Sequence, residues 1–541
     1  MPPEVSPLEV TPEELEALLE GVREALGEVG YQKLKAAIRT LSYVTELLEN
    51  REATLASLRR LLCRARSEKT EAVLEQAGIA RSPTPGKPPA DEGSKKPAVG
   101  HGRNGATAYP GAHRVAVSHA SLHRGDRCPE CQRGKVYPLQ EPGRLVRMRG
   151  QAPIAATVYE LEKLRCNLCG EVFTAEAPAS VGAEKYDATT ASMIALLRYG
   201  SGFPWHRLEG LQENLGIPLP AATQCEIVAQ AAARIRPAME ELIRQAAQGE
   251  VLHNDDTSMP VLTLRRAVGA DADEDAERTG VFTSGIVSTA QEQSVALFFT
   301  GRRHAGENLA EVLQRRAAEL APPMQMCDAL SRNLPKLPPT LEVIVGHCLA
   351  HARRRFVEVT PNFPEPCRHV LEQLGEVYRN GACAQEQAMT PQERLRFHQR
   401  QSGPVMDRLH AWLTSQFEER KVEPNSGLGL AMRYLLKHWE RLTLFLRQPG
   451  APLDNNICER ALKKAILHRK NSLFYKTENG ARVGDLFMSL IHSCELSSAN
   501  PFDYLTQLQR HADELARNPS AWMPWNYPAS LETSGASLDS G

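Results

Sequence analysis

Apolar and polar positions follow two different periods along the chain, and the change of period divides it into segments. Residues 183–248 have the helical period, with breaks at Gly202-Phe203-Pro204 and at Gly216-Ile217-Pro218. Strands are then predicted at residues 250–255, 281–289, 294–300, 324–328 and 341–348, with a helix at 304–321 between the third and fourth strands. This order predicts an α/β core whose first three strands form an antiparallel meander and whose later strands cross over.

The segments on either side of this core are mostly helical. Residues 349–447 have the helical period throughout, and residues 11–75 are rich in helix-forming residues. Four leucines in the N-terminal segment recur every seven residues: Leu41, Leu48, Leu55 and Leu62. Arg51 interrupts this pattern, so a dimeric coiled coil and a single amphipathic helix that packs on its own domain are both open. Residues 79–98 are rich in Pro, Gly, Ser and charge, which predicts a linker.

Composition narrows the class of protein. The 541 residues predict three or four domains, and 42% hydrophobic with 24% charged residues exclude a wholly disordered, collagen-like or disulfide-scaffold protein. No apolar stretch reaches the ~20 residues that span a bilayer, and the acidic N-terminus has no signal-peptide core. We therefore expect a soluble cytoplasmic protein. Because the net charge is −1, any affinity for nucleic acid must come from local basic patches.

Two regions are candidates for DNA contact. Residues 81–150 hold 13 Lys and Arg against 5 Asp and Glu, which fits either a flexible solvated face or contact with backbone phosphates. The helical pattern of residues 181–248 resembles a helix-turn-helix, which can place a helix in a major groove. Most such helical pairs merely pack against each other, so both interpretations are open.

The cysteines predict one structural metal site. Four of the twelve form two Cys-x-x-Cys pairs separated by 34 residues: Cys128 with Cys131, and Cys166 with Cys169. Two such pairs supply the four thiolates of a tetrahedral zinc site in a zinc-ribbon-like module, and four sulfur ligands leave no open position for water. The alternatives are four unrelated free cysteines, or replacement of a cysteine ligand by His119 or His123.

Three acidic positions suggest a site for hard divalent cations. Asp255, with Asp256 beside it, ends the first predicted strand, Asp328 ends a later one, and Glu459 lies in a predicted helix. Carboxylates at neighbouring strand ends can hold two Mg²⁺ ions, as phosphodiester chemistry requires. Because the chain has 65 acidic residues, capping or solvated roles remain the alternative for each position taken alone.

Several motifs occur together in an order that resembles the insertion sequence 66 family of bacterial DDE transposases. The resemblance covers roughly residues 40–510, and its most specific part is the segment around Glu459. The motifs are Ser67-Glu68-Lys69, His101-Gly102-Arg103, the paired Cys-x-x-Cys, residues 253–257, residues 347–356 with Cys348 and His351, residues 452–462 with 468–474, and residues 500–505.

The resemblance implies a ribonuclease-H-like catalytic core in which a helical insertion precedes the glutamate of an Asp-Asp-Glu triad. Matched by position, the triad is Asp255, Asp328 and Glu459, whose successive members are 73 and 131 positions apart. Asp256 stands where the family has Glu. Asp328 is followed by Ala329-Leu330 where the family has Gly and an aromatic residue.

The resemblance also implies the chemistry and the partners. The triad would bind Mg²⁺ or Mn²⁺ and catalyse cleavage and strand transfer at the ends of an insertion element, with double-stranded DNA as partner. We expect phosphate contacts from Arg460, Lys463, Lys464, Arg469, Lys470, Arg353 and Arg354. Cys348 and His351 form either a buried structural pair or half of a shared metal site. A homo-oligomer, accessory proteins of the element and association with the bacterial nucleoid are further expectations.

We therefore expect a multidomain α+β DNA transposase. The expected parts are a helical segment at 1–77, a linker at 78–115, a zinc module at 116–180, a helical DNA-binding region at 181–248, a catalytic core at 249–360 and 448–515, a helical insertion at 361–447, and a disordered tail at 516–541. Two alternatives stay open: a catalytically inactive, transposase-derived DNA-binding protein, and a ribonuclease-H-like nuclease that cleaves DNA without joining it.

Overall fold

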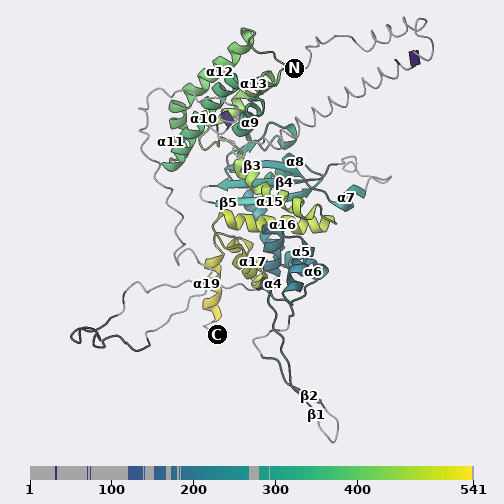
Figure 1. Cartoon of the computed structure of the whole chain (residues 1–541), viewed down its shortest axis with the longest axis vertical. Coiled ribbons are helices and arrows are strands. Elements are labelled where there is room, and N and C mark those ends of the chain that lie inside the picture. Colours follow the sequence, from purple (N-terminus) through teal and green to yellow (C-terminus); the bar gives the residue numbers. More distant parts are fainter. Residues whose placement is uncertain are drawn as a thin grey trace. The chain divides into compact units, whose positions relative to one another are not determined.

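The computed structural model describes residues 31–32, 34, 70, 73–74, 120–137, 139, 152–165, 172–178, 182, 184–266, 280–290 and 293–538 (Figure 1). The chain forms two compact units. The larger contains residues 83–352, 380–404 and 434–541, and the smaller contains residues 1–82, 353–379 and 405–433. The leucine repeat, the predicted linker, Cys166 and Cys169 lie outside the described residues.

A five-stranded mixed sheet with the order β5-β4-β3-β6-β7 forms the centre of the larger unit. Its strands are β3 Val251–Ser258, β4 Phe282–Ala290, β5 Gln293–Gly301, β6 Met324–Cys327 and β7 Ile344–His347. Strands β3, β4 and β5 pair antiparallel, whereas β6 pairs parallel with β3 and β7 parallel with β6. The helix α8 Ala305–Leu313 connects β5 to β6. The predicted strands, their meander and the later crossover are confirmed.

Helix α16, Glu478–Leu496, covers β5, which is an edge strand of the sheet. The backbone N–H groups of alternate β5 residues donate to α16 side chains: Ala296 to Ser493 Oγ at 3.0 Å, Phe298 to Ser489 Oγ at 2.9 Å, and Thr300 to Asp485 Oδ2 at 2.7 Å. A helix presents positions four apart on one face, so these three acceptors line up along the strand. Side chains of α16 thus take the place of a sixth strand.

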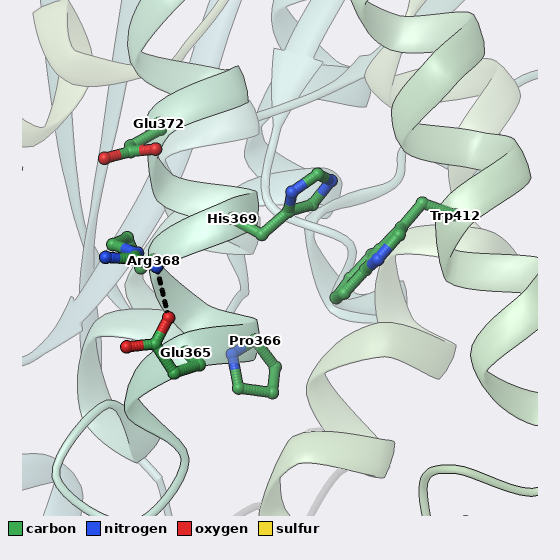
Figure 2. A pocket seen from close by; sticks show the side chains of 6 residues that line it. All are labelled: Glu365, Pro366, Arg368, His369, Glu372 and Trp412. Carbon is green, nitrogen blue, oxygen red and sulfur yellow. Dashed lines mark hydrogen bonds and ion pairs between the residues drawn. The ribbon is translucent and has the colours of Figure 1, made fainter. Parts of the chain in front are cut away.

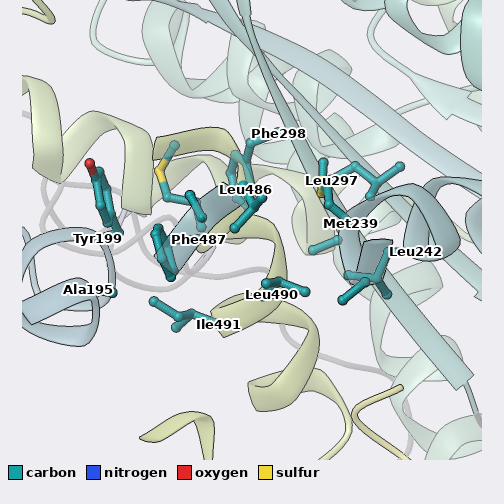
Figure 3. Close-up of a cluster of buried hydrophobic side chains, with 14 of the residues drawn as sticks. Ala195, Tyr199, Met239, Leu242, Leu297, Phe298, Leu486, Phe487, Leu490 and Ile491 are labelled. Atoms are coloured by element: carbon teal, nitrogen blue, oxygen red, sulfur yellow. The ribbon is translucent and has the colours of Figure 1, made fainter. Parts of the chain in front are cut away.

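The apolar side of α16 contributes to the core of the larger unit. Phe487, Leu490 and Ile491 are fully buried in one cluster that also contains Phe298 of β5 and Leu242 (Figure 3). Around this cluster, α16 contacts the sheet on one side and the helical region before the sheet on another (Figure 1). The core therefore joins segments that lie more than 200 residues apart in the sequence.

The segment before the sheet is helical, as predicted. It consists of α4 Ala188–Ala195, the π-helical turn η3 Leu196–Gly200, α5 Trp205–Asn214 and α6 Ala221–Ala246. Pro204 and Pro220 are the N-cap residues of α5 and α6, so the predicted breaks coincide with helix boundaries. One face of α6 is buried against α4, α16 and β5. This long helix is therefore in part a core element.

The expectation of a disordered tail is wrong for residues 516–538. The segment after α17, Pro501–Arg510, forms α18 Ala512–Arg517, the 3-10 turn η7 Pro519–Trp522 and α19 Tyr527–Leu538. Trp522 and Met523 are buried, and the hydroxyl of Tyr504 donates to the carbonyl oxygen of Trp522 at 2.9 Å. A few large apolar residues anchor the segment even though its composition is rich in Ser, Gly and Pro.

The predicted insertion is helical, but it is divided between the two units. Its helices are α10 Pro364–Glu386, α11 Pro391–Gln401, α12 Gly403–Glu418, α13 Gly427–Lys437 and α14 Trp439–Leu442, with the 3-10 turn η6 Leu444–Leu446; α9 Leu349–Val359 precedes the insertion. Residues 380–404 and 434–447 belong to the larger unit. The smaller unit, taken by itself, holds most of α9, α10, α12 and α13.

A short two-stranded sheet precedes these elements. Strands β1 Lys163–Arg165 and β2 Val172–Thr174 pair antiparallel, and the second cysteine pair falls between them, outside the described residues. Two described helices remain, the short α7, Leu262–Arg266, and α15, Asn456–Ser472. Within the described ranges, no helix has the length and apolar character needed to cross a bilayer.

Candidate active site

Asp255 and Asp256 are successive residues of β3, so their side chains point to opposite faces of the strand. Asp256 is 1% exposed at its side chain, and its carboxylate lies 2.8 Å from His304 Nδ1 and 3.3 Å from Arg332 Nη2. His304 is the N-cap residue of α8, and Arg332 belongs to the 3-10 turn η5, Ser331–Asn333. Asp256 therefore connects β3 to these two elements.

Asp255 and Asp328 converge on one buried amide. Asn333 Nδ2 donates to Asp328 Oδ1 at 2.6 Å and to Asp255 Oδ1 at 3.2 Å. Asp255 lies on β3 and Asp328 directly follows β6, the parallel neighbour of β3. The carboxyl ends of parallel strands meet at one edge of a sheet, and this brings together two residues 73 positions apart.

Two polar side chains of the sheet hold the backbone of Asn333 in place. Asn254 Nδ2 and Gln325 Nε2 both donate to its carbonyl oxygen, at 2.8 and 2.7 Å. All three side chains are fully buried. Nothing in the sequence pattern identified Asn333, because it lies in a three-residue turn that has no periodicity.

The pKa of Asp255 is shifted because its carboxyl group is buried next to a second carboxyl group. Burial and the negative charge of Asp328 raise the pKa of Asp255 to about 7. The hydrogen bonds from the Asp256 backbone and from Asn333 oppose this rise. Two carboxyl groups that are kept close at one sheet edge are a suitable donor set for a hard divalent cation, which would offset their repulsion.

Glu459 lies in the first turn of α15, Asn456–Ser472, and Asn455 fixes the start of this helix. Asn455 is fully buried: its Nδ2 donates to the carbonyl oxygen of Asn254 at 3.1 Å, and its Oδ1 lies 3.1 Å from His253 Nδ1. The helix thereby packs against the β3 face that carries Asp255. Consistent with this, burial and the charge of Asp255 raise the pKa of Cys458.

The structure groups Glu459 with Cys348 and His351. Glu459 Oε1 lies 3.6 Å from His351 Nδ1, and one ligand atom from each of the three residues lies within 4.8 Å of the others. Among the described residues, this is the only set of three or more His, Cys, Asp or Glu side chains so closely spaced. The three predicted triad carboxylates are not gathered within that distance.

The predicted phosphate-binding residues differ in exposure. Arg460, Lys463 and Lys470 are exposed on α15. By contrast, Lys464 is paired with Glu495 at 2.7 Å, and Arg469 donates to Thr257 Oγ1 at 3.1 Å.

The two arginines of α9 belong to the smaller unit. Arg353 is 7% exposed and donates to Thr70 Oγ1 at 3.2 Å, and Arg354 is partly buried. A buried guanidinium that is bonded within the protein is not available to a DNA phosphate, so the structure does not support the expected role of Arg353.

The described cysteine pair lies in a tight turn. Cys128 N–H donates to the carbonyl oxygen of Gly134 at 2.8 Å, and Gly134 N–H donates to Cys131 Sγ at 3.5 Å. Backbone hydrogen bonds from Gly134 and Arg133, followed by the Cys128 side chain, lower the pKa of Cys131. Backbone N–H groups directed at a cysteine sulfur also occur in zinc knuckles, so this turn is compatible with the predicted module, whose second cysteine pair lies outside the described residues.

A separate pocket lies on the smaller unit, between α10 and α12 (Figure 2). The ring centroids of His369 and Trp412 lie 4.3 Å apart, and Arg368 forms an ion pair with Glu365. None of the predicted catalytic or metal-binding residues lines it.

Comparison with known proteins places most of the described chain in one family. The model of the family described as "Transposase IS66 family" matches residues 184–483. The uncharacterized protein y4hP of Sinorhizobium fredii strain NGR234 is 25% identical over 68% of this chain and 67% of its own length. Two other uncharacterized proteins of that strain are also similar: y4jD, 31% identical over 34% of this chain and 36% of its own length, and y4qI, 25% over 62% and 61%.

Proposed function

The chain belongs to the IS66 transposase family, and we propose that it is the DNA transposase of an insertion element, which binds the terminal inverted repeats and catalyses metal-dependent strand cleavage and strand transfer. The observation that carries the proposal is the convergence of Asp255 and Asp328 on Asn333. A mixed sheet with three antiparallel and two further parallel strands is consistent with a ribonuclease-H-like core.

The donor set at this edge fits Mg²⁺ or Mn²⁺, because it consists of carboxylate oxygens held close together. Asp255 and Asp328 would hold the ions, and Glu459 would complete the triad by turning its side chain from His351 toward the sheet. Two ions at such a site activate a hydroxyl nucleophile and stabilise the leaving oxygen. Asn333 orients the two aspartates, and Asn455 anchors the helix that carries the glutamate.

The exposed side of α15 supplies a surface for DNA beside the proposed site. Arg460, Lys463 and Lys470 follow the spacing i, i+3 and i+10, so they form one basic stripe along the helix. Because Glu459 precedes Arg460, the stripe starts next to the proposed catalytic carboxylate. Contacts from these side chains to phosphates would position the scissile strand without reading its sequence.

Single substitutions test the assignment. Asp255→Asn and Glu459→Gln should abolish Mg²⁺-dependent cleavage of DNA that carries the ends of the element, while binding to those ends is retained, because only the ion ligands are removed. Glu478→Gln is a matched control, since Glu478 is partly exposed and paired with Arg482 on α16. Cleavage at wild-type rates in either site variant would refute the triad.

The products distinguish the remaining alternatives. Cleavage followed by joining of the freed 3′ end to target DNA is expected of a transposase. Cleavage without joining would indicate a ribonuclease-H-like nuclease, and end binding without either reaction would indicate an inactive DNA-binding protein. The same reaction, repeated at several protein concentrations and with proteins encoded beside the gene, tests the expected homo-oligomer and accessory partners.

A further inference from the structure

We propose that Cys348, His351 and Glu459 form a binding site for one thiophilic divalent ion, with Zn²⁺ as the natural candidate. The three ligand atoms lie within 4.8 Å of one another although the residues come from segments more than 100 positions apart. The site shares no residue with the predicted four-cysteine zinc module, and it shares only Glu459 with the proposed Mg²⁺ triad.

The donor types determine which ion would bind. A cysteine sulfur, an imidazole nitrogen and a carboxylate oxygen together are typical of Zn²⁺ or Co²⁺, whereas Mg²⁺ prefers oxygen ligands alone. Three protein ligands leave a fourth position for water or a phosphate oxygen. Because one of the ligands is a thiolate, this site should prefer a different ion from the one that a pair of aspartates binds.

The backbone holds the two segments together. Leu349 N–H donates to the carbonyl oxygen of Leu453 at 3.0 Å, and Asn455 N–H donates to Cys348 Sγ at 3.2 Å. The second bond uses one lone pair of the sulfur, and a thiolate has others for a metal; it resembles the N–H···S bonds that support thiolate ligands. The ligand framework is thus present without the ion.

Two of the three ligand side chains are partly exposed, so an ion can reach the site from the solvent. Cys348 is fully buried, whereas the side chains of His351 and Glu459 are each 24% exposed. The atoms that face each other, His351 Nδ1 and Glu459 Oε1, are themselves buried, so an ion would bind beneath the surface, and the exposed parts of these two side chains mark the side from which it would enter. Cys348 directly precedes α9 and His351 is the third residue of that helix, so the two side chains are about one turn apart and can face the same point.

Cobalt spectroscopy tests the site on the full chain. In a variant with Cys128, Cys131, Cys166 and Cys169 all changed to serine, which keeps no thiolate of the predicted four-cysteine site, Co²⁺ should still give thiolate-to-cobalt charge-transfer absorption. The absorption should disappear when Cys348→Ser is added and persist with Cys494→Ser, the matched change at a fully buried cysteine of α16. Absorption of unchanged intensity in the Cys348→Ser variant would overturn the proposal.

A second substitution covers the case in which Cys348→Ser does not fold. His351 is partly exposed, so His351→Asn should fold and should weaken Co²⁺ binding about tenfold or more. Unchanged Co²⁺ affinity in this variant would also overturn the site. Both measurements use metal and protein without DNA, so a failure to cleave DNA would count against the proposed function and not against this site.

One consequence rests on the proposed function. An ion held by Cys348 and His351 engages the carboxylate that the triad needs, so Zn²⁺ should inhibit Mg²⁺-dependent cleavage by the wild-type protein. If cleavage occurs and the inhibition is equally strong in His351→Asn, the two sites do not share Glu459.

Discussion

Asn333 Nδ2 lies 2.6 Å from Asp328 Oδ1, and the same amide nitrogen donates to Asp255 at 3.2 Å. The contact makes a residue of a three-residue turn the link between two strands of the sheet. Removal of the amide would leave two neighbouring carboxylates without a shared donor.

Asn333→Ala should raise the pKa of Asp255 further above 7, because the hydrogen bond from Asn333 lowers it. The acidic limb of the pH profile for Mg²⁺-dependent cleavage should move to higher pH by about one unit, the size expected from loss of a hydrogen bond to a charged group. Asn308→Ala is the control, since Asn308 donates to Ser284 Oγ at 2.8 Å and is also buried. An unshifted profile for Asn333→Ala, or an equal shift for Asn308→Ala, would contradict the positioning role.

Lys470→Gln should weaken binding to DNA and reduce the slope of log K against log salt by about 1, as loss of one phosphate contact does. Lys464→Gln is the matched control on the same helix, because Lys464 is already paired with Glu495. Filter binding or fluorescence anisotropy over a salt series measures both slopes. Equal slopes for the two variants would show that the exposed stripe does not contact phosphates.

Stability should depend on the ionisation of Asp485, whose pKa burial raises to about 7. Since the unfolded value is near 3.8, the protonated group contributes its full stability below about pH 4, and the contribution is lost as the pH rises through 7. The loss amounts to at most about 4 kcal/mol. The side chain of Asp485→Asn stays neutral, so the Tm of this variant should rise relative to the Tm of the wild type as the pH increases from 5 to 8. A difference in Tm that does not change with pH would rule out this ionisation.

Cys128→Ser should release about one zinc ion per chain, because a four-thiolate site does not hold zinc firmly after loss of one ligand. Mass spectrometry of the dialysed protein measures the zinc content. Cys225→Ser is the control, since Cys225 is an exposed cysteine in α6. If the wild-type chain holds no zinc, the knuckle interpretation fails.

Sequence periodicity was sufficient to predict the sheet. The strands predicted around Asp255 and Asp328 agree with β3 and β6 within a few residues, because the change from the helical period is visible in the local sequence. The break predicted at Gly202-Phe203-Pro204 marks the start of α5 for a similarly local reason, because Pro204 is the N-cap residue of that helix. Predictions of this kind need no knowledge of distant contacts.

Other features depend on contacts between distant segments, which no local pattern contains. The sequence placed Glu459 with the aspartates, whereas the structure groups it with Cys348 and His351. The direction of the Glu459 side chain depends on the position of α15. Asn455 fixes that position through its hydrogen bond to the backbone of β3. The ordered tail was missed because the burial of Trp522 outweighs the polar composition around it.

Helix α16 protects β5 from other molecules as well as supporting it. Without this helix, the N–H groups of Ala296, Phe298 and Thr300 would be open to a strand from a second chain. During synthesis, about 180 residues must follow β5 before α16 is made, so the nascent chain must keep this edge from aggregating. A product that terminates early, between α15 and α16, would therefore be prone to intermolecular strand pairing and would depend on chaperones.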